Sequence, residues 1–367
     1  MIDFISNNND IQLENINDKI HRGKRISADD AIYLYKNAPM GIVAYLADSI
    51  KRKLHGEKVF YNKNFHVEPT NICVFNCDFC SFSTTDTTKG WKKSHDDIME
   101  IVRQKGNSGA NEIHITGGAI PEYNIDFYIK LFNDIKKEFP NIHIKAFTAV
   151  EINYFAHLAT LDVEEVLIRL KKAGLDSMPG GGAEIFDEII RKKICKKKLS
   201  GEQWLKTHEI AHNNNISSNA TMLYGHVENI EHRIDHLSKL RDLQDKTKGF
   251  NAFIPLKFRN KNNRLSDVQE TSIIDDLKTF AVARIFLDNI PHLKAYWPMI
   301  GKDIAKLLLN FGVDDLDGTI QNTTKIYSMA GSKESEPEMT EDKLRDLIFS
   351  AGFKAVERDS LYNSLHI

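Results

Sequence analysis

Three of the four cysteines, Cys73, Cys77 and Cys80, lie within eight residues of each other. Their C-x3-C-x2-C spacing lets three thiolates of one loop point at a common centre, and such crowding indicates metal binding rather than disulfide bonds. Three thiolates can bind three irons of a four-iron, four-sulfur cubane, so the fourth iron stays open to a chelating ligand from outside the protein. The chemistry predicted for this loop is therefore that of an iron–sulfur cluster with one free coordination site.

A structural zinc site is the alternative interpretation of the same cysteines. Such a site needs four protein ligands, and His66 or His95 would have to complete a Cys3His set. Zinc modules usually take a second cysteine pair from a distant segment, which Cys195 alone, in the basic stretch 191–198, does not provide. We therefore favour the cluster, interpret Cys195 as structural, and keep a zinc-stabilised binding module as the contrasting hypothesis.

The rest of the sequence predicts the elements that position this loop. Apolar, β-prone runs alternate with amphipathic helical patterns, as in a parallel sheet built from repeated β/α units. Eight strands are expected, near residues 65–69, 112–116, 143–147, 174–178, 218–222, 250–256, 292–297 and 314–319. Helices are expected between them, at 125–139, 163–173, 204–213, 231–246, 272–288 and 303–310. The sequence thus predicts an α/β fold, a (β/α)8 barrel of the TIM type, with the cysteine loop at the carboxyl end of its first strand, where loops converge.

Segments on either side of the barrel are also expected to be helical. Apolar spacing in 28–35 and 41–54 divides the chain into an N-terminal helical extension, residues 1–59, and a barrel, residues 60–367. Thr340, which two acidic residues follow, predicts the N-cap of a closing helix. An open barrel of six β/α units with appended helices stays an alternative.

The composition limits the classes of partner. The 367 residues include 49 Lys and Arg and 51 Asp and Glu, a formal net charge of -2, so no excess of one sign favours nucleic acid or an acidic membrane. Residues 1–20 are polar, unlike a secretory signal, and no apolar run approaches the roughly 20 residues that cross a bilayer. We therefore expect a cytoplasmic protein that acts on a small molecule.

The cysteine loop, with Phe79 directly before its last cysteine, resembles that of the radical S-adenosylmethionine (SAM) superfamily. Further segments resemble those of the aminofutalosine synthase family, which serves menaquinone biosynthesis. They are HVEPTN at 66–71, ITGGAIP at 115–121, KAFTAVE at 145–151, SMPGGGAEIF at 177–186, SNATMLYGH at 218–226 and FNAFIPL at 250–256. The same group contains the dehypoxanthine futalosine cyclase and the deazaflavin (F420) synthase subunits, but HVEPT and FTAVE are more similar to the synthase.

This resemblance implies that Cys73, Cys77 and Cys80 hold a 4Fe-4S cluster whose open iron binds SAM. It implies that SAM is consumed as a co-substrate: the 5'-deoxyadenosyl radical adds to the vinyl carbon of 3-[(1-carboxyvinyl)oxy]benzoate and leads to 6-amino-6-deoxyfutalosine and methionine. It also implies an electron donor, such as flavodoxin or ferredoxin. The cyclase or a deazaflavin synthase subunit is the alternative activity.

Four residues are candidates for binding SAM. Gly117 and Gly118 end the second predicted strand, where missing β-carbons would let backbone carbonyls approach the SAM ammonium, although a simple turn is the alternative. The resemblance implies that Glu151 holds the ribose or ammonium of SAM, while a helix cap is its structural alternative. Phe79 is expected to pack beside the cluster or the adenine.

The remaining candidates concern the substrate and catalysis. Gly181 and Gly182 follow the fourth strand, before a helix expected near residue 183, and their amides could receive an anionic group, although a flexible joint is the alternative. Glu184 falls just beyond the same strand end, on the side that faces the active site of a barrel. Arg259 and Lys257, after the sixth strand, could pair with a substrate carboxylate, although a solvated surface charge is the alternative.

Residues at predicted strand ends are candidates for catalysis, because these ends face the active site of a barrel. The resemblance implies that His66 and Glu68 orient the substrate, and His226 is placed similarly. Each of these side chains could instead satisfy a buried backbone group.

Overall fold

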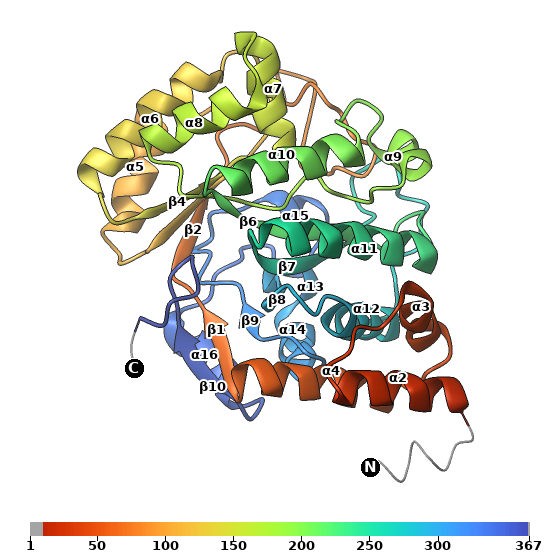
Figure 1. Cartoon of the computed structure of the whole chain (residues 1–367). Coiled ribbons are helices and arrows are strands. Elements are labelled where there is room, and N and C mark those ends of the chain that lie inside the picture. The colour runs from red at the N-terminus through yellow and green to blue at the C-terminus, as the bar shows by residue number, and fades with distance from the viewer. Residues whose placement is uncertain (1–9, 366–367) are drawn as a thin grey trace.

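The computed structural model describes residues 10–365, and its ten parallel strands form one sheet. The order of the strands is β10-β1-β9-β8-β7-β6-β5-β4-β3-β2. Figure 1 shows the sheet curved, with helices packed around its outer side. The strands are β1 (Lys58–Tyr61), β2 (Asn64–Val67), β3 (Glu112–Ile115), β4 (His143–Ala146), β5 (Ser177–Met178), β6 (Ser217–Tyr224), β7 (Phe250–Lys257), β8 (His292–Ala295), β9 (Asp315–Leu316) and β10 (Lys354–Glu357).

The predicted α/β fold of TIM type is confirmed, and each of the eight expected strands has a counterpart among β2–β9. The sequence did not predict β1 and β10, which pair in parallel with each other. At the seam between β2 and the end of β9, side chains make the connection. Asn64 donates to Asp317 Oδ1 (3.1 Å) and accepts from Ile320 N (3.1 Å), and Thr319 Oγ1 donates to Asn64 O (2.9 Å).

Helices cover the outer face because their apolar sides pack on the strands. The N-terminal helices α2 (Ile11–His21), α3 (Ala28–Lys36) and α4 (Met40–His55) share one apolar core with the barrel. The division of the chain at residue 59 stays a prediction, and β1 crosses it. The others are α5 (His95–Gly106), α6 (Ile125–Glu138), α7 (Ala149–Ala159), α8 (Val163–Ala173), α9 (Glu188–Ile194), α10 (Gly201–Asn213), α11 (Ile230–Thr247), α12 (Ile273–Phe286), α13 (Trp297–Ile300), α14 (Lys302–Leu308), α15 (Ile326–Met329) and α16 (Glu341–Phe349).

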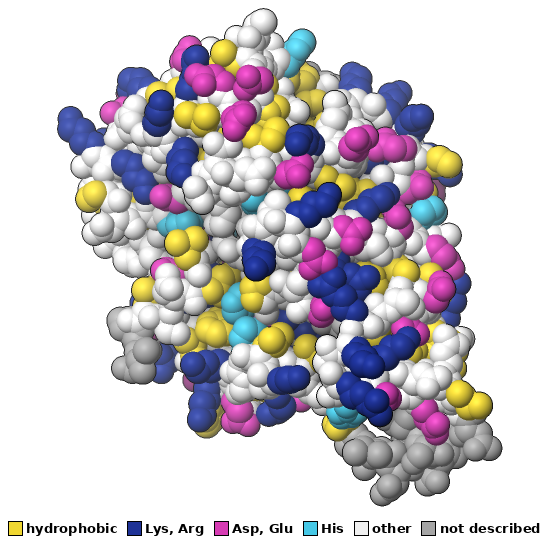
Figure 2. All heavy atoms as spheres, in the orientation of Figure 1, with side chains coloured by type: hydrophobic (Ala, Val, Ile, Leu, Met, Phe, Trp, Pro, Cys, Tyr) yellow, Lys and Arg dark blue, Asp and Glu magenta, His cyan; other side chains and the backbone are white. Residues whose placement is uncertain are grey.

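Local sequence signals set several helix boundaries. Ser94 caps α5 with a capping box, and Thr340 caps the closing helix α16 through Lys343 N, as its sequence predicts. None of the helices within residues 10–365 combines the length and the apolarity that crossing a bilayer requires. On the face shown in Figure 2, basic and acidic side chains are interspersed.

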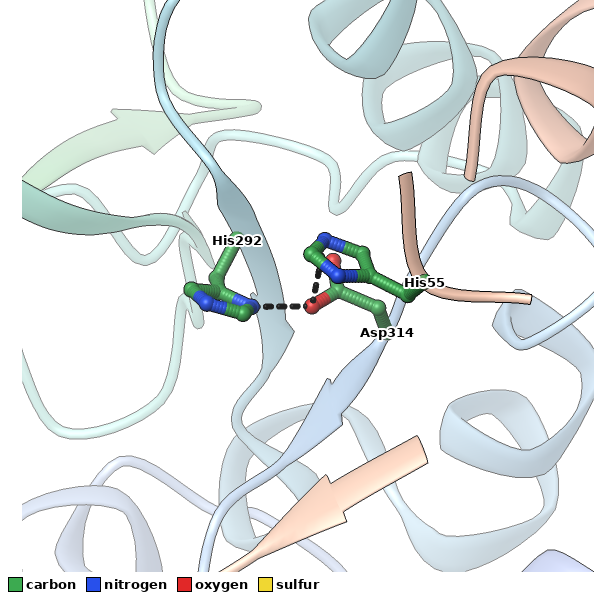
Figure 3. Close-up of side chains that lie close together, drawn as sticks. All are labelled: His55, His292 and Asp314. Atoms are coloured by element: carbon green, nitrogen blue, oxygen red, sulfur yellow. Dashed lines mark hydrogen bonds and ion pairs between the residues drawn. The ribbon is translucent and has the colours of Figure 1, made fainter. Parts of the chain in front are cut away.

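A cluster of three side chains, His55, His292 and Asp314, connects α4 to the amino ends of β8 and β9 (Figure 3). His292 bonds to Asp314 Oδ2 (2.5 Å), and His55 Nε2 lies 3.6 Å from the same oxygen. The atoms of these three side chains that could bind a metal ion lie within 4.8 Å of one another. However, the Asp314 carboxylate already accepts hydrogen bonds from Arg284 and from Leu293 N. Burial would raise the pKa of Asp314, but Arg284 and His292 outweigh it and lower it to about 2. We interpret this cluster as structural, at the end of the sheet opposite the cysteine loop.

Buried neutral histidines should make the fold sensitive to acid. Burial lowers the pKa of His66 and His212 to about 4 and that of His236 to about 3, whereas unfolded histidine titrates near 6.5. Between these values only the unfolded chain takes up the protons, so stability present above about pH 6.5 is lost as the pH falls. We expect the free energy of unfolding to drop by about 1.4 kcal/mol per pH unit for each histidine.

Urea unfolding at pH 7.5, 6 and 5 measures this slope. A free energy of unfolding that stays constant or rises between pH 7.5 and 5 would contradict the assignment of neutral histidines. The variant His212→Gln should show a smaller slope than the parent, because it removes one of the groups that titrate in the unfolded chain.

Candidate functional site

The three clustered cysteines line one cavity at the carboxyl end of the sheet, with a volume of about 270 Å³. Their loop runs between β2 and α5. Backbone bonds from Cys73 N to Thr84 O (2.9 Å) and from Asp78 N to Ile194 O (2.8 Å) hold it. Burial raises the pKa of the Cys77 thiol to about 12, against the opposing Lys198 ammonium, so metal binding has to displace a tightly held proton.

The number of ligands distinguishes a cluster from zinc. A structural zinc ion needs four protein ligands, whereas three thiolates suffice for a cubane whose fourth iron stays open. The three cysteines that line this cavity therefore fit a cubane held at three corners.

Gly117 and Gly118 support the cysteine loop directly. A β-carbon on Gly118 would lie 2.0 Å from Ile72 O, and one on Gly117 would lie 2.7 Å from Thr70 O. Gly118 N donates to Thr70 O (2.7 Å), so the end of β3 and the start of the loop are bonded at this close approach. Both glycines also line the cavity, and their contact with the SAM ammonium stays a prediction.

A segment that follows β7 holds the outer side of the cysteine loop. The Arg264 guanidinium donates to Asp78 Oδ1 (2.5 Å), to Asn76 Oδ1 (2.9 Å) and to Asn76 O. Ser81 Oγ donates to Lys261 O (2.6 Å). Asn76 has a positive φ of 49°, a conformation that asparagine tolerates better than most residues. The loop is therefore fixed from both sides by the protein.

The structure brings most of the predicted site residues to this cavity. Besides the three cysteines, they are His66, Phe79, Gly117, Gly118, Glu151, Gly181, Gly182 and Glu184. Glu151 also completes the capping box of α7, whose N-cap is Thr148. It accepts bonds from Thr148 N (2.8 Å), Thr116 Oγ1 (3.1 Å) and Gly117 N (3.2 Å), while burial raises its pKa. The protein thus occupies much of the bonding capacity that the SAM role predicted for Glu151 would need.

Three predicted residues do not line the cavity, and each has partners elsewhere. Glu68 accepts from Thr324 Oγ1 (2.6 Å) and Lys325 N (3.0 Å), which ties the segment before α15 to β2. His226 lies 3.1 Å from both Leu223 O and Glu228 Oε2. Arg259 pairs with Glu270 at 2.8 Å. These bonds give all three side chains structural tasks, and the geometry offers no support for their predicted roles.

The helix expected near residue 183 begins at Glu188, with Asp187 as its N-cap, so that prediction is wrong. The amides of Gly181 and Gly182 therefore do not stand at a helix N-terminus. Glu184 has a positive φ of 47° and pairs with Lys198 Nζ (2.7 Å), which lies 5.1 Å from the centroid of the Phe79 ring. The sequence did not predict this buried ion pair beside the cysteines, because nothing distinguishes Lys198 from the other basic residues of the stretch 191–198.

Further polar side chains line the cavity below the cysteines, and among them the sequence had predicted only His66 as a site residue. The sequence carries a pattern that indicates these residues, because EIHI in β3, HIKA in β4 and HLKA in β8 alternate polar and apolar residues. Helices cover the outer face, so the polar positions face inward. We call this set the polar floor: Asn64, His66, Glu112, His114, Lys145, Lys294 and Asp317.

Two family models match the chain. The family model described as the radical SAM superfamily matches residues 67–240, and the CofH/MqnC C-terminal region matches residues 247–367. The chain is 41% identical to an aminodeoxyfutalosine synthase of Thermus thermophilus, with 98% of this chain and 97% of that protein covered. It is 34% identical to an aminodeoxyfutalosine synthase of Streptomyces coelicolor (95% and 92% covered) and 37% identical to a cyclic dehypoxanthine futalosine synthase of the same organism (96% and 89%).

Solved structures agree in fold. Methylornithine synthase (PylB) superposes with a TM-score of 0.73 at 16% identity, covering 93% of this chain and 97% of its own. The hydrogenase maturase HydG of Carboxydothermus hydrogenoformans gives a TM-score of 0.76 at 15% identity, covering 98% and 83%. Radical SAM enzymes use a 4Fe-4S cluster and SAM, and the three-cysteine cavity fits that cofactor. The chain therefore belongs to the radical SAM superfamily and is a radical SAM enzyme homologous to aminodeoxyfutalosine synthase.

Proposed function

We propose that the enzyme is an aminodeoxyfutalosine synthase, which joins the 5'-deoxyadenosyl group of SAM to 3-[(1-carboxyvinyl)oxy]benzoate and forms 6-amino-6-deoxyfutalosine for menaquinone biosynthesis. Methionine is released from SAM, and the carboxyl group of the carboxyvinyl part leaves as carbon dioxide or bicarbonate. The observation that supports this proposal most is the 41% identity to the Thermus thermophilus synthase along nearly the whole of both chains. A cyclase activity is the second candidate, because the identity to the cyclic dehypoxanthine futalosine synthase is 37% over a similar length.

The proposed division of labour follows the layers of the cavity. Cys73, Cys77 and Cys80 would hold the cluster, which when bound supplies the electron that splits a carbon–sulfur bond of SAM. Apolar and aromatic side chains of the wall exclude water from the reacting atoms: Phe79, Ile254, Leu256, Tyr296 and Tyr327. The polar floor faces the substrate, and the walls place the alkene within reach of the adenosyl carbon.

The electron has to come from another molecule, and a small redox protein such as flavodoxin or ferredoxin is the proposed donor. A cytoplasmic location stays a prediction from the composition. The proposed donor can be examined separately from the reaction, because dithionite can replace it in the test below.

Product analysis tests the proposed function. The reconstituted enzyme is incubated without oxygen with dithionite, SAM and 3-[(1-carboxyvinyl)oxy]benzoate, and the products are separated by mass. We expect methionine and an adduct that retains the adenosine, with the mass of 6-amino-6-deoxyfutalosine. If no adduct forms while dehypoxanthine futalosine is converted and 5'-deoxyadenosine is released, the enzyme is the cyclase and the proposal is wrong.

A further inference from the structure

The polar floor is unusual for the interior of a barrel of this type. Such interiors are normally filled by layers of branched apolar side chains. Here His66 of β2 pairs in register with His114 of β3, which pairs with Lys145 of β4. These side chains all line the cavity, and so does Lys294 of β8, whose ammonium acts electrostatically on His66. A row of donors across three strands, with a lysine close to it, is therefore built into the sheet.

Two imidazoles of this row have ring nitrogens without a hydrogen-bond partner in the described part of the chain. The His66 side chain is only 3% exposed, and neither of its ring nitrogens has a hydrogen-bond partner among residues 10–365. The same is true of the buried Nε2 atom of His114, whose ring centroid lies 4.6 Å from that of His66. A buried polar atom without a partner is costly, and each neutral imidazole retains one N–H donor. These groups would be satisfied by a polar group of a ligand.

The two lysines of the floor differ in how tightly the protein pairs them. Lys145 Nζ lies 2.5 Å from Glu112 Oε2, a close ion pair. Lys294 Nζ lies 3.4 Å from Asp317 Oδ1 and 3.7 Å from Asp315 Oδ1, longer than the usual charge-assisted bond of about 2.7–2.9 Å. Both aspartates also have other donors. Lys294 is therefore the buried cation of the floor with bonding capacity to offer.

Other donors bond to one oxygen of each of these carboxylates. Asp317 Oδ1 accepts from Asn64 Nδ2 (3.1 Å) and Gly318 N (3.0 Å), and Asp315 Oδ2 accepts from Arg358 Nε (2.5 Å). An anion that approached Lys294 would therefore leave Asp317 with two donors and Asp315 Oδ2 with Arg358. Asp315 Oδ1 has no hydrogen-bond partner among residues 10–365, and Lys294 lies 3.7 Å from it. The anion would gain a buried ammonium, which binds carboxylates strongly where water is excluded.

We infer that His66, His114 and Lys294 form a subsite for an aromatic carboxylate, which holds the benzoate end of the substrate. This inference rests on the proposed function and assigns one end of that substrate. The carboxyvinyl alkene has to lie near the cysteines, where SAM reacts, so its own carboxylate stays near the mouth. The benzoate carboxylate, on the far side of the ring, extends to the floor. Lys294 provides the charge, and the imidazoles provide N–H donors.

Binding measurements test the subsite independently of turnover. The reconstituted enzyme with SAM is titrated calorimetrically, without oxygen, with 3-[(1-carboxyvinyl)oxy]benzoate and with its methyl ester at the benzoate carboxyl. Lys294→Met keeps the length of the side chain and removes the charge. We expect the Kd for the acid to rise about 10- to 100-fold in this variant, because a hydrogen bond to a charged group is lost. Affinities for the ester and for SAM should stay within a factor of about three.

A second variant and a matched control protect the test against misfolding. His66→Leu should weaken binding of the acid about tenfold, and His66→Gln, which restores a donor, should recover part of that loss. Lys278→Met also removes a partly buried lysine, one that bonds to Tyr35 O outside the cavity, and should bind the acid like the parent.

Three outcomes would overturn the inference. If Lys294→Met binds the acid as tightly as the parent, or loses affinity for acid and ester equally, the lysine does not hold this carboxylate. If the variant instead loses affinity for SAM, the floor serves SAM. If the parent enzyme cleaves SAM but does not bind the acid at all, the proposed function fails, and the subsite assignment fails with it.

Discussion

Replacing Cys77 with alanine should abolish reductive cleavage of SAM. Cys77 is the most buried of the three clustered cysteines, and two thiolates cannot hold the cubane in the orientation that keeps one iron open. Iron bound per chain after anaerobic reconstitution should fall well below that of the parent. The measurement is 5'-deoxyadenosine released from SAM in the presence of dithionite, which we expect at the level of the protein-free control.

Cys195 provides the matched control for that experiment. It is buried, its charge would act on Cys77 electrostatically, and yet it does not line the cavity. The variant Cys195→Ala should keep the iron content and the SAM cleavage of the parent. Retained SAM cleavage in Cys77→Ala, or equal losses in the two variants, would show that the cysteine loop does not hold the cofactor in the way proposed.

A methyl group added at Gly118 should displace the cysteine loop. Its β-carbon would lie 2.0 Å from Ile72 O, a backbone atom one residue before Cys73, so the loop has to shift. We expect Gly118→Ala to destabilise the fold by about 1–3 kcal/mol, the range for overpacking a tight site. Because the shift falls on the cysteine loop, iron content and SAM cleavage should also fall at least about tenfold.

Gly41 in α4 is the control for this substitution. A β-carbon there meets no atom within 4 Å and its backbone is helical, so Gly41→Ala should change the free energy of unfolding by less than about 1 kcal/mol, with iron content unchanged. Urea unfolding and iron analysis of the two variants side by side measure both effects. A Gly118→Ala protein with the stability and iron content of the parent would contradict the close approach described here.

The sequence predicted the barrel well because its signals are local. Alternating apolar and polar runs predict strands and helices, and the spacing of Cys73, Cys77 and Cys80 predicts a metal loop without reference to distant residues. The short strands β1 and β10 were missed because each needs the other as a partner. Their pairing joins residues almost 300 positions apart, from Lys58 to Lys354, and no local pattern contains it.

The site was predicted only in part, because position at a strand end does not fix where a side chain turns. Glu68, His226 and Arg259 follow strands as expected, but Thr324, Glu228 and Glu270 bind them away from the cavity. Those partners come from loops whose course the sequence does not reveal.

The polar floor could have been found from the sequence. His114, Lys145 and Lys294 alternate with apolar residues inside strands that helices cover, and only an inward orientation explains such polar positions. Strand-end reasoning overlooked them because they lie within the strands. Alternation inside covered strands is thus a signal for binding residues that complements the rule of strand ends.

We infer that three thiolates hold a cubane whose fourth iron binds SAM. Electron paramagnetic resonance of the reduced, anaerobically reconstituted protein, recorded with and without SAM, tests this binding. We predict about four irons per chain and a spectrum whose g values shift when SAM is added, since SAM becomes a ligand of the open iron. A colourless protein with one zinc per chain, or a cluster spectrum that SAM leaves unchanged, would contradict it.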